Sequence, residues 1–288
     1  MTCSDLADVP VAWSWLKEFS RSPAHALYRA LQPDGGEQTL AMRMGSGVHA
    51  KLFGTPPIHV YSGAVRRGKE WDAFKAAAGD GALILNEREH DIAVGMATAL
   101  CDDPIASPLL FGPGVEHEQP MAWEVNGRAY RTRGVDFRNR KAGYIGELKS
   151  SRTVQPGRFE RDQLRALYPV QVEMYDEGDA ILTGRDRTKD PFRKYIVAVE
   201  PTPPHVVCVY ELAPSAIRQA VKTIALYRSQ LATCEASNAW PGYALSVVPF
   251  EVEESDFDAV EDDEIAADAG PLESASWPTD EQDEQPAF

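Results

Sequence analysis

Residues 123–149, WEVNGRAYRTRGVDFRNRKAGYIGELK, decide the fold, because they have the pattern of consecutive short strands with charged side chains near their ends. We expect Asp136 to close one strand, and Glu147 and Lys149 to close the next. Residues two apart on a strand point to the same side, so Glu147 and Lys149 share a face while Leu148 turns into the core. The sequence therefore predicts that two carboxylates and an ammonium group meet at one edge of a sheet.

This combination of side chains fits a divalent metal site. Carboxylate oxygens are hard ligands of the kind that Mg²⁺ prefers, and an ammonium group can stand beside a water that attacks a phosphodiester. An Asp followed about ten residues later by Glu-x-Lys is common by chance. The alternative interpretation is a hairpin with ordinary surface charges.

The acidity of the chain is confined to its C-terminal end. The net charge is −15, and residues 251–288 contain 15 Asp and Glu but no Lys or Arg. Residues 1–250 therefore carry 29 basic and 29 acidic side chains and are neutral overall. A balanced folded part can present a basic groove to a nucleic acid even though the whole chain is strongly acidic.

The cysteines and the hydropathy point to a soluble protein in a reducing compartment. Cys3, Cys101, Cys208 and Cys234 have no C-x-x-C spacing, so we expect free thiols and neither a zinc site nor an iron-sulfur cluster. No apolar run approaches the roughly 20 residues that span a bilayer, and the N-terminus lacks the pattern of a signal peptide. The expected location is the cytoplasm.

The order of the patterns predicts one α/β domain with an appended tail. Helical spacing dominates about residues 11–101, strand patterns dominate about 115–212, and a long helix is expected from about 214 to 234. A last short strand is expected to end at Phe250, which closes a domain of residues 1–250. Residues 251–288 are too acidic and too poor in apolar side chains to form a core, so we expect disorder there.

Three further groups of residues deserve notice on the predicted helices. His49 follows small residues in GSGVHAKLFG, where a helix can approach its neighbour closely. Gln171 and Tyr175 are four residues apart on a helix and therefore share a face, as packing residues often do. A basic cluster of Arg66, Arg67 and Lys69 precedes an amphipathic helix; it either contacts phosphates or is a solvated helix start.

Taken in order, these residues match the motifs of a known nuclease superfamily. His49, Asp136, Glu147-x-Lys149 and Gln171-x-x-x-Tyr175 resemble the motif series of the RecB-like branch of the PD-(D/E)XK nucleases. More narrowly, about residues 12–245 are similar to the catalytic domain of the RecE-type exonucleases of phages and prophages (exodeoxyribonuclease VIII). The similar segments are SPAHALYR, MGSGVHAKLFG, RRGKEWDAF, GVDF, GELKSS, FERDQLRALYPVQVEMY and WPGY.

The resemblance implies a restriction-endonuclease-like fold, with a central mixed sheet flanked by helices, and a role for each motif residue. Asp136 and Glu147 would bind Mg²⁺, for which Mn²⁺ could substitute, together with the backbone carbonyl of Leu148. His49 would be a nitrogen ligand or would contact a ligand. Lys149 would orient or deprotonate the attacking water, and its burial near cations could lower its pKa.

The remaining implied roles are weaker. Gln171 and Tyr175 would hold the DNA strand or an outer water, and Glu118 could be a helper carboxylate or could simply be exposed. Two positions depart from the family pattern: Val135 replaces the proline of the motif, and Glu147 stands where these exonucleases often have Asp.

The resemblance also implies an activity and partners. It implies an ATP-independent 5′→3′ exonuclease that resects the ends of double-stranded DNA to 3′ single strands for homologous recombination. Such enzymes are ring-shaped homo-oligomers, trimers or tetramers, that work with a RecT-type annealing protein in a bacterial host. The chain contains no Walker motif GxxxxGK[ST], as expected for an enzyme that does not use ATP.

Two alternatives and one hypothesis about the tail remain. The chain could be another RecB-like nuclease, such as a CRISPR-associated or repair-associated one, or a noncatalytic protein that binds DNA ends. The acidic C-terminus ending in Phe288 is similar to the tip of bacterial single-stranded DNA-binding proteins, which docks onto partners. A tail that solubilises the protein and repels nonspecific DNA is the simpler explanation.

Overall fold

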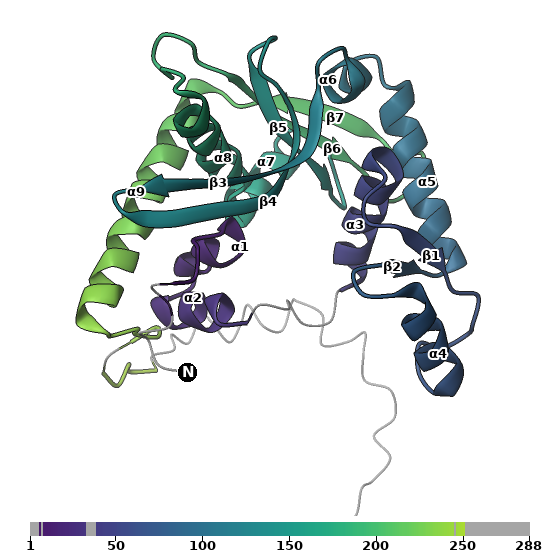
Figure 1. The fold of residues 1–288 in the computed structure, drawn as a ribbon, viewed down its shortest axis with the longest axis horizontal. Coiled ribbons are helices and arrows are strands. Elements are labelled where there is room, and N and C mark those ends of the chain that lie inside the picture. The colour runs from purple at the N-terminus through teal and green to yellow at the C-terminus, as the bar shows by residue number, and fades with distance from the viewer. Residues whose placement is uncertain (1–5, 7, 33–38, 245, 251–288) are drawn as a thin grey trace, which may run out of the picture. The chain divides into compact units, whose positions relative to one another are not determined.

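A five-stranded mixed sheet in the order β3-β4-β5-β6-β7 forms the centre of the protein, in a computed structural model that describes residues 6, 8–32, 39–244 and 246–250 (Figure 1). Neighbouring strands are antiparallel except β5 and β6, which are parallel. The strands are β3 (Glu116–Val125), β4 (Arg128–Asn139), β5 (Tyr144–Ser150), β6 (Arg193–Val199) and β7 (Val207–Glu211). Asp136 was expected to close a strand but lies inside β4, which continues to Asn139.

The turn between β3 and β4 explains why residues 116–139 form a hairpin. Asn126 and Gly127 both have positive φ angles, 52° and 77°, which a two-residue hairpin turn of type I′ requires. Further along this ladder the register shifts between Gln119 and Met121, which marks a β-bulge. The bulge lies two residues from Glu118, whose φ of 49° is also positive.

Helices pack on both faces of the sheet and create two hydrophobic cores (Figure 1). One core joins β3, β4, β5 and β6 to the N-terminal helices α1 (Trp13–Leu16) and α2 (Pro23–Ala30) and to the helices that follow β5. The other core joins β4, β5 and β6 to α3 and α5. The remaining elements are η2 (Lys17–Ser20), α3 (Leu40–Phe53), β1 (Ile58–Val60), α4 (Lys69–Ala78), β2 (Leu83–Leu85), α5 (Glu87–Asp102), α6 (Ala106–Phe111), α7 (Arg158–Ala166), α8 (Tyr168–Thr183) and α9 (Pro214–Ser237).

Local signals in the sequence set the ends of the helices that carry the candidate residues. The hydroxyl of Thr39 accepts a hydrogen bond from the Met42 amide at the start of α3, and Gly54 ends this helix in the left-handed conformation. Leu167, with a φ of 60°, separates α7 from α8, and Pro169 stands in the first turn of α8. The helical stretch that follows β5 is therefore divided into two helices just before Pro169.

Most predicted elements are present, and the exceptions are short. Strands β6 and β7 lie within about residues 115–212, where strands were expected, and the long helix α9 begins at Pro214, as expected. The parallel pair of β1 and β2 and the short α6 were not predicted. The prediction of a short strand ending at Phe250 is wrong, because the described residues 246–250 contain no strand. The predicted disorder of 251–288 falls outside the described residues. Within the described part, every helix is too short or too polar to cross a bilayer.

Candidate metal centre

His49, on helix α3, contacts residues of three neighbouring strands of the sheet, β3, β4 and β5. Its Nε2 lies 3.2 Å from the backbone oxygen of Leu148 and 3.6 Å from Oδ2 of Asp136. Its Nδ1 lies 2.9 Å from Oε1 of Glu118. The ring therefore points one nitrogen at Asp136 and the predicted carbonyl ligand, and the other at Glu118.

Glu118 and Asp136 face each other across the β3–β4 ladder. The flanking pairs His117–Phe137 and Gln119–Val135 set this register. Gly134 makes room for the Glu118 side chain, because a Cβ at position 134 would stand 2.8 Å from Glu118 Oε2 and 3.0 Å from its Cα. A glycine at this place is therefore required by the close approach of Glu118.

Asp136 is the acid at the centre of the group. It is buried, and its Oδ2 accepts a hydrogen bond of 2.7 Å from the Leu148 amide on the neighbouring strand. One ligand atom from each of His49, Glu118 and Asp136 lies within 4.8 Å of the others. The two strands and α3 therefore gather three potential ligands from distant parts of the sequence.

Glu147 and Lys149 lie beside this group, on the next strand. Lys149 Nζ is 2.6 Å from Glu147 Oε2 and 3.9 Å from Asp136 Oδ2. The same Glu147 oxygen accepts a hydrogen bond of 2.7 Å from the Gln171 side chain on α8. The shared face of Glu147 and Lys149 that the sequence predicts thus turns toward Asp136.

Burial and neighbouring charges shift the pKa values of the site. Burial opposes the charged form of His49, but the negative charge of Asp136 and the hydrogen bond to Glu118 raise the pKa of the imidazole to about 9. Burial, together with the charge of Asp136, raises the pKa of Glu147. Burial also opposes the charge of Lys149, yet Glu147 and Asp136 raise its pKa above the ordinary value.

The shift of Lys149 is opposite to the lowering that we expected from the sequence. The expectation assumed that nearby cations would dominate, whereas the nearest groups are two carboxylates, and the ammonium also lies over the ring of Tyr168 at 4.8 Å. A charged Lys149 is suited to hold and orient a water or a phosphate oxygen. Removing a proton from water would require it to be neutral first.

The side chains fit a hard divalent cation. Glu147 Oε1 is buried and has no hydrogen-bond partner among the described residues. An orphaned carboxylate oxygen in the protein interior is costly unless a cation or a donor satisfies it. The donor set at hand is Asp136, Glu147 and the Leu148 carbonyl, with the imidazole of His49 as a nitrogen donor, which suits Mg²⁺ or Mn²⁺.

Glu118 fits best as the group that orients His49. A ligating histidine usually directs its other ring nitrogen to a carboxylate, which fixes the orientation of the ring. The Glu118 contact to Nδ1 has this geometry and leaves Nε2 turned toward Asp136. From the sequence, Glu118 was expected to be either a helper carboxylate or simply an exposed residue. The signal for a stronger role was the glycine nearby, Gly134.

The other predicted residues occupy different environments. Gln171 also donates to the hydroxyl of the buried Tyr175 at 3.4 Å. Tyr175 therefore helps to orient Gln171, which in turn holds Glu147. Arg66 is ion-paired with Glu89 and donates to the Ile84 carbonyl, which ties the loop before α4 to β2 and α5. Arg67 and Lys69 are exposed. Their contact with DNA stays a prediction.

Sequence patterns missed the contribution of the N-terminal helical layer. Lys17, on η2, is half-buried and close enough to Lys149 for electrostatic interaction. Burial lowers the pKa of Lys17, and the charges of Lys149 and Arg29 lower it further, although Glu18 acts in the opposite direction. A lysine 132 positions away in the sequence carries no local signal of this proximity.

Comparison with known proteins identifies the family of the chain and solved structures that are similar to it. The family model that matches residues 12–247 is described as "PDDEXK-like domain of unknown function (DUF3799)". None of the curated proteins matches the chain. The crystal structure of a "putative exonuclease" from Eubacterium rectale covers 88% of this chain and 95% of its own, with 14% identity and a TM-score of 0.58. At that identity the likeness shows the fold alone.

A second solved structure, described as SSO0001, is less similar. It covers 54% of this chain and 77% of its own, with 17% identity and a TM-score of 0.26. A likeness this low supports no argument about the present chain.

Proposed function

This chain belongs to the family of PDDEXK-like domains of unknown function (DUF3799), and from that premise we propose that it is a metal-dependent deoxyribonuclease. The observation that carries the proposal is the convergence of His49, Glu118 and Asp136 within 4.8 Å, with the Glu147–Lys149 pair beside them. A protein that only bound DNA would have no need to collect carboxylates where a polyanion approaches.

In this proposal the residues of the site have different roles in phosphodiester hydrolysis. Asp136 and Glu147 would hold the cation, with the Leu148 carbonyl and His49 Nε2 completing its ligands. A bound Mg²⁺ would polarise the phosphate and lower the pKa of a water molecule. The charged Lys149 would hold the attacking water or a nonbridging oxygen in position, and its positive charge would stabilise the negative charge of the transition state.

Gln171 and Glu118 would act on other residues of the site. The amide of Gln171 holds Glu147 Oε2 through its hydrogen bond, so the other oxygen of Glu147 stays free for the cation. Glu118 holds the ring of His49 through Nδ1. Both are therefore positioning residues.

We further propose the finer activity of the RecE-type enzymes. In this proposal the protein is an ATP-independent 5′→3′ exonuclease that resects duplex ends to 3′ single strands, as a homo-oligomeric ring beside a RecT-type annealing protein in a bacterial cytoplasm. The support is the ordered motif series and the similar segments between about residues 12 and 245. The acidic tail would repel nonspecific DNA or dock onto the host single-stranded DNA-binding protein.

The test is a cleavage assay with end-labelled linear duplex and Mg²⁺. Wild type should degrade linear DNA and spare closed circles, and a 5′ label should be released before a 3′ label. Lys149→Ala is the inactive control. Degradation of closed circles would instead indicate an endonuclease, and no cleavage with Mg²⁺ or Mn²⁺ would refute the nuclease proposal.

A further inference from the structure

The aromatic ring of Tyr168 lies against the ammonium group of Lys149. The Nζ atom is 4.8 Å from the ring centroid, which is within the roughly 6 Å over which the face of an aromatic ring attracts a cation. The carboxylates near the same ammonium are Glu147 at 2.6 Å and Asp136 at 3.9 Å. Tyr168 differs from both, because its ring attracts a cation without offering a carboxylate that a metal ion could bind.

Tyr168 extends a stripe of site residues along α8. It lies three residues before Gln171 and seven before Tyr175, so the three side chains share one face of the helix. Gln171 holds Glu147 through its hydrogen bond of 2.7 Å, and Tyr168 contacts Lys149 on the same strand. The first turn of α8 therefore reaches both charged residues of β5.

The backbone just before Tyr168 has an uncommon conformation. Leu167 has a φ of 60° and a ψ of 29°, in the left-handed region that a non-glycine residue rarely adopts. Its carbonyl accepts hydrogen bonds from the amides of Val170 and Gln171 at 3.1 and 3.2 Å, so α8 begins directly after it. Strained backbone of this kind clusters at functional sites. The turn at Leu167 sets the position from which Tyr168 reaches Lys149.

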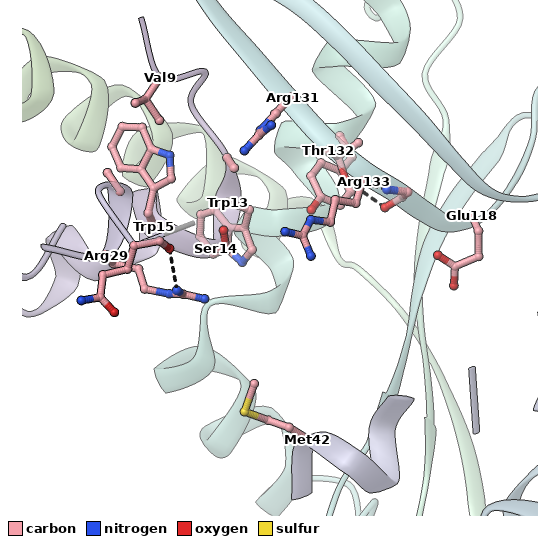
Figure 2. A pocket seen from close by; sticks show the side chains of 15 residues that line it. Val9, Trp13, Ser14, Trp15, Arg29, Met42, Glu118, Arg131, Thr132 and Arg133 are labelled. Carbon is pink, nitrogen blue, oxygen red and sulfur yellow. Dashed lines mark hydrogen bonds between the residues drawn. The ribbon is translucent and has the colours of Figure 1, made fainter. Parts of the chain in front are cut away.

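Tyr168 is not part of the cavity beside the metal centre. This cavity has a volume of about 420 Å³, and Figure 2 shows Glu118 and Thr132 at its wall, with Trp13 from α1. Tyr175, at the far end of the stripe, also lines it, whereas Tyr168 is absent from the lining within the described part of the chain. Tyr168 therefore acts on Lys149 and not on the contents of this cavity.

A divalent cation would change the surroundings of Lys149. When Asp136 and Glu147 bind the cation, it neutralises their negative charge and repels the ammonium group. The attraction of an aromatic ring does not depend on these carboxylates, and it is stronger where water is excluded. Only 16% of the Lys149 side chain is exposed, so the ring can retain the ammonium at the site.

We infer that Tyr168 is a positioning residue that holds the Lys149 ammonium over its ring while a divalent cation occupies the two carboxylates. This inference rests on the proposed nuclease function and adds to it a residue that the motif series does not contain. The ring keeps the ammonium from turning to solvent, so Lys149 stays in place to orient the attacking water or a phosphate oxygen.

NMR spectroscopy of protein labelled with ¹³C at the ε position of lysine tests the contact without any cleavage. The ring should shift the methylene signal of Lys149 upfield, and Lys149→Arg identifies this signal by its absence. In wild type the upfield shift should persist at saturating Mg²⁺. It should be lost in Tyr168→Leu and remain in Tyr168→Phe, which keeps the ring. A Lys149 signal that moves to the position of an exposed lysine when Mg²⁺ binds would overturn the inference.

Steady-state kinetics on linear duplex measure the consequence for cleavage. Tyr168→Leu should lower kcat roughly tenfold with little change in KM, because the ring acts on Lys149 and not on the binding of DNA. Tyr168→Phe should stay within about twofold of wild type. Tyr28→Leu, at an exposed tyrosine on α2, is the matched control and should equal wild type. An unchanged kcat in Tyr168→Leu would overturn the inference, as would an equal loss in Tyr168→Phe, which would assign the effect to the hydroxyl.

The two measurements separate this inference from the proposed function. If wild type cleaves and Tyr168→Leu is unimpaired, Tyr168 is not a positioning residue although the nuclease proposal stands. If wild type never cleaves, the nuclease proposal fails, and the Lys149 signal with Mg²⁺ still decides whether the ring holds the ammonium. The wild-type spectrum needs no change at position 168, so it also decides this question if Tyr168→Leu fails to fold.

Discussion

Metal binding should release protons, and His49 should account for about one of them. The pKa of His49 is about 9 in the metal-free protein, so the imidazole is roughly 90% protonated at pH 8 and about 99% protonated at pH 7. A metal ion binds only the neutral ring, so each ion must displace a proton. Glu147, whose pKa is also raised, should add to the release.

The magnitude follows from this shift. Between pH 7 and pH 9 the affinity for Mn²⁺ should rise by up to about tenfold per pH unit for the His49 proton alone, which corresponds to about 1.4 kcal/mol. Isothermal titration calorimetry in two buffers with different ionisation enthalpies measures the number of protons released. His49→Gln should release about one proton fewer than wild type, and His90→Gln on α5 serves as the control.

Two results would refute this reasoning. One is binding of Mn²⁺ at pH 7 without proton release, because both raised pKa values would then be irrelevant to the metal. The other is a His49→Gln variant that releases as many protons as wild type, which would place the ion away from the imidazole.

Three further outcomes are expected. Asp179→Ala should lower the free energy of unfolding by about 3–5 kcal/mol, because this fully buried carboxylate pairs with two arginines, one on β4 and one in the turn after it. Urea titrations measure this loss, and a loss of less than about 1 kcal/mol would contradict the role of the ion pairs. Gly134→Ala should displace Glu118 and slow cleavage while the protein stays folded, whereas Gly242→Ala, which meets no atom within 4 Å, should be silent. The raised pKa of His49 adds stability that is fully present below its unfolded pKa of 6.5 and is lost as the pH rises through about 9, so the Tm of the metal-free protein should fall over that interval. The Tm of His49→Gln should fall less than that of wild type between these pH values, and an equal fall in both proteins would contradict the assignment to His49.

The sequence predicted the parts of the fold that depend on local signals. The strand pattern of residues 123–149 predicts consecutive strands there, and the pattern from about 214 to 234 predicts a long helix. The face shared by Glu147 and Lys149 follows from the period of a strand. These features need no knowledge of residues far away in the chain.

The surroundings of the site could not be predicted in the same way. The role of Glu118 depends on the bulge near Met121 and on the space left by Gly134, and both are properties of strand pairing. The raised pKa of Lys149 depends on which charges end up nearest to it. Arg29 on α2 and Arg131 on β4 line one cavity although about 100 residues separate them, and no pattern in either segment indicates the other.

The buried ion pairs around α8 could not be predicted from local sequence patterns either. Glu173, Asp176 and Asp179 read as the polar positions of a surface helix, yet all three are buried. Their partners come from β4, the turn after it, β6 and the loop after α8: Arg138, Arg140, Arg185, Arg187 and Lys194. This network anchors the helix that presents Gln171 and Tyr175 to the site.

The most direct test of the account is a crystal structure with Mn²⁺ and its anomalous difference map. The central claim is that three segments, α3, β4 and β5, hold one cation through His49, Asp136, Glu147 and the Leu148 carbonyl. We predict a peak about 2.1 Å from an oxygen of Asp136, with Glu147, the Leu148 carbonyl and His49 Nε2 around it. A map without a peak there, with Lys149 still bridging Asp136 and Glu147 at saturating Mn²⁺, would contradict the claim.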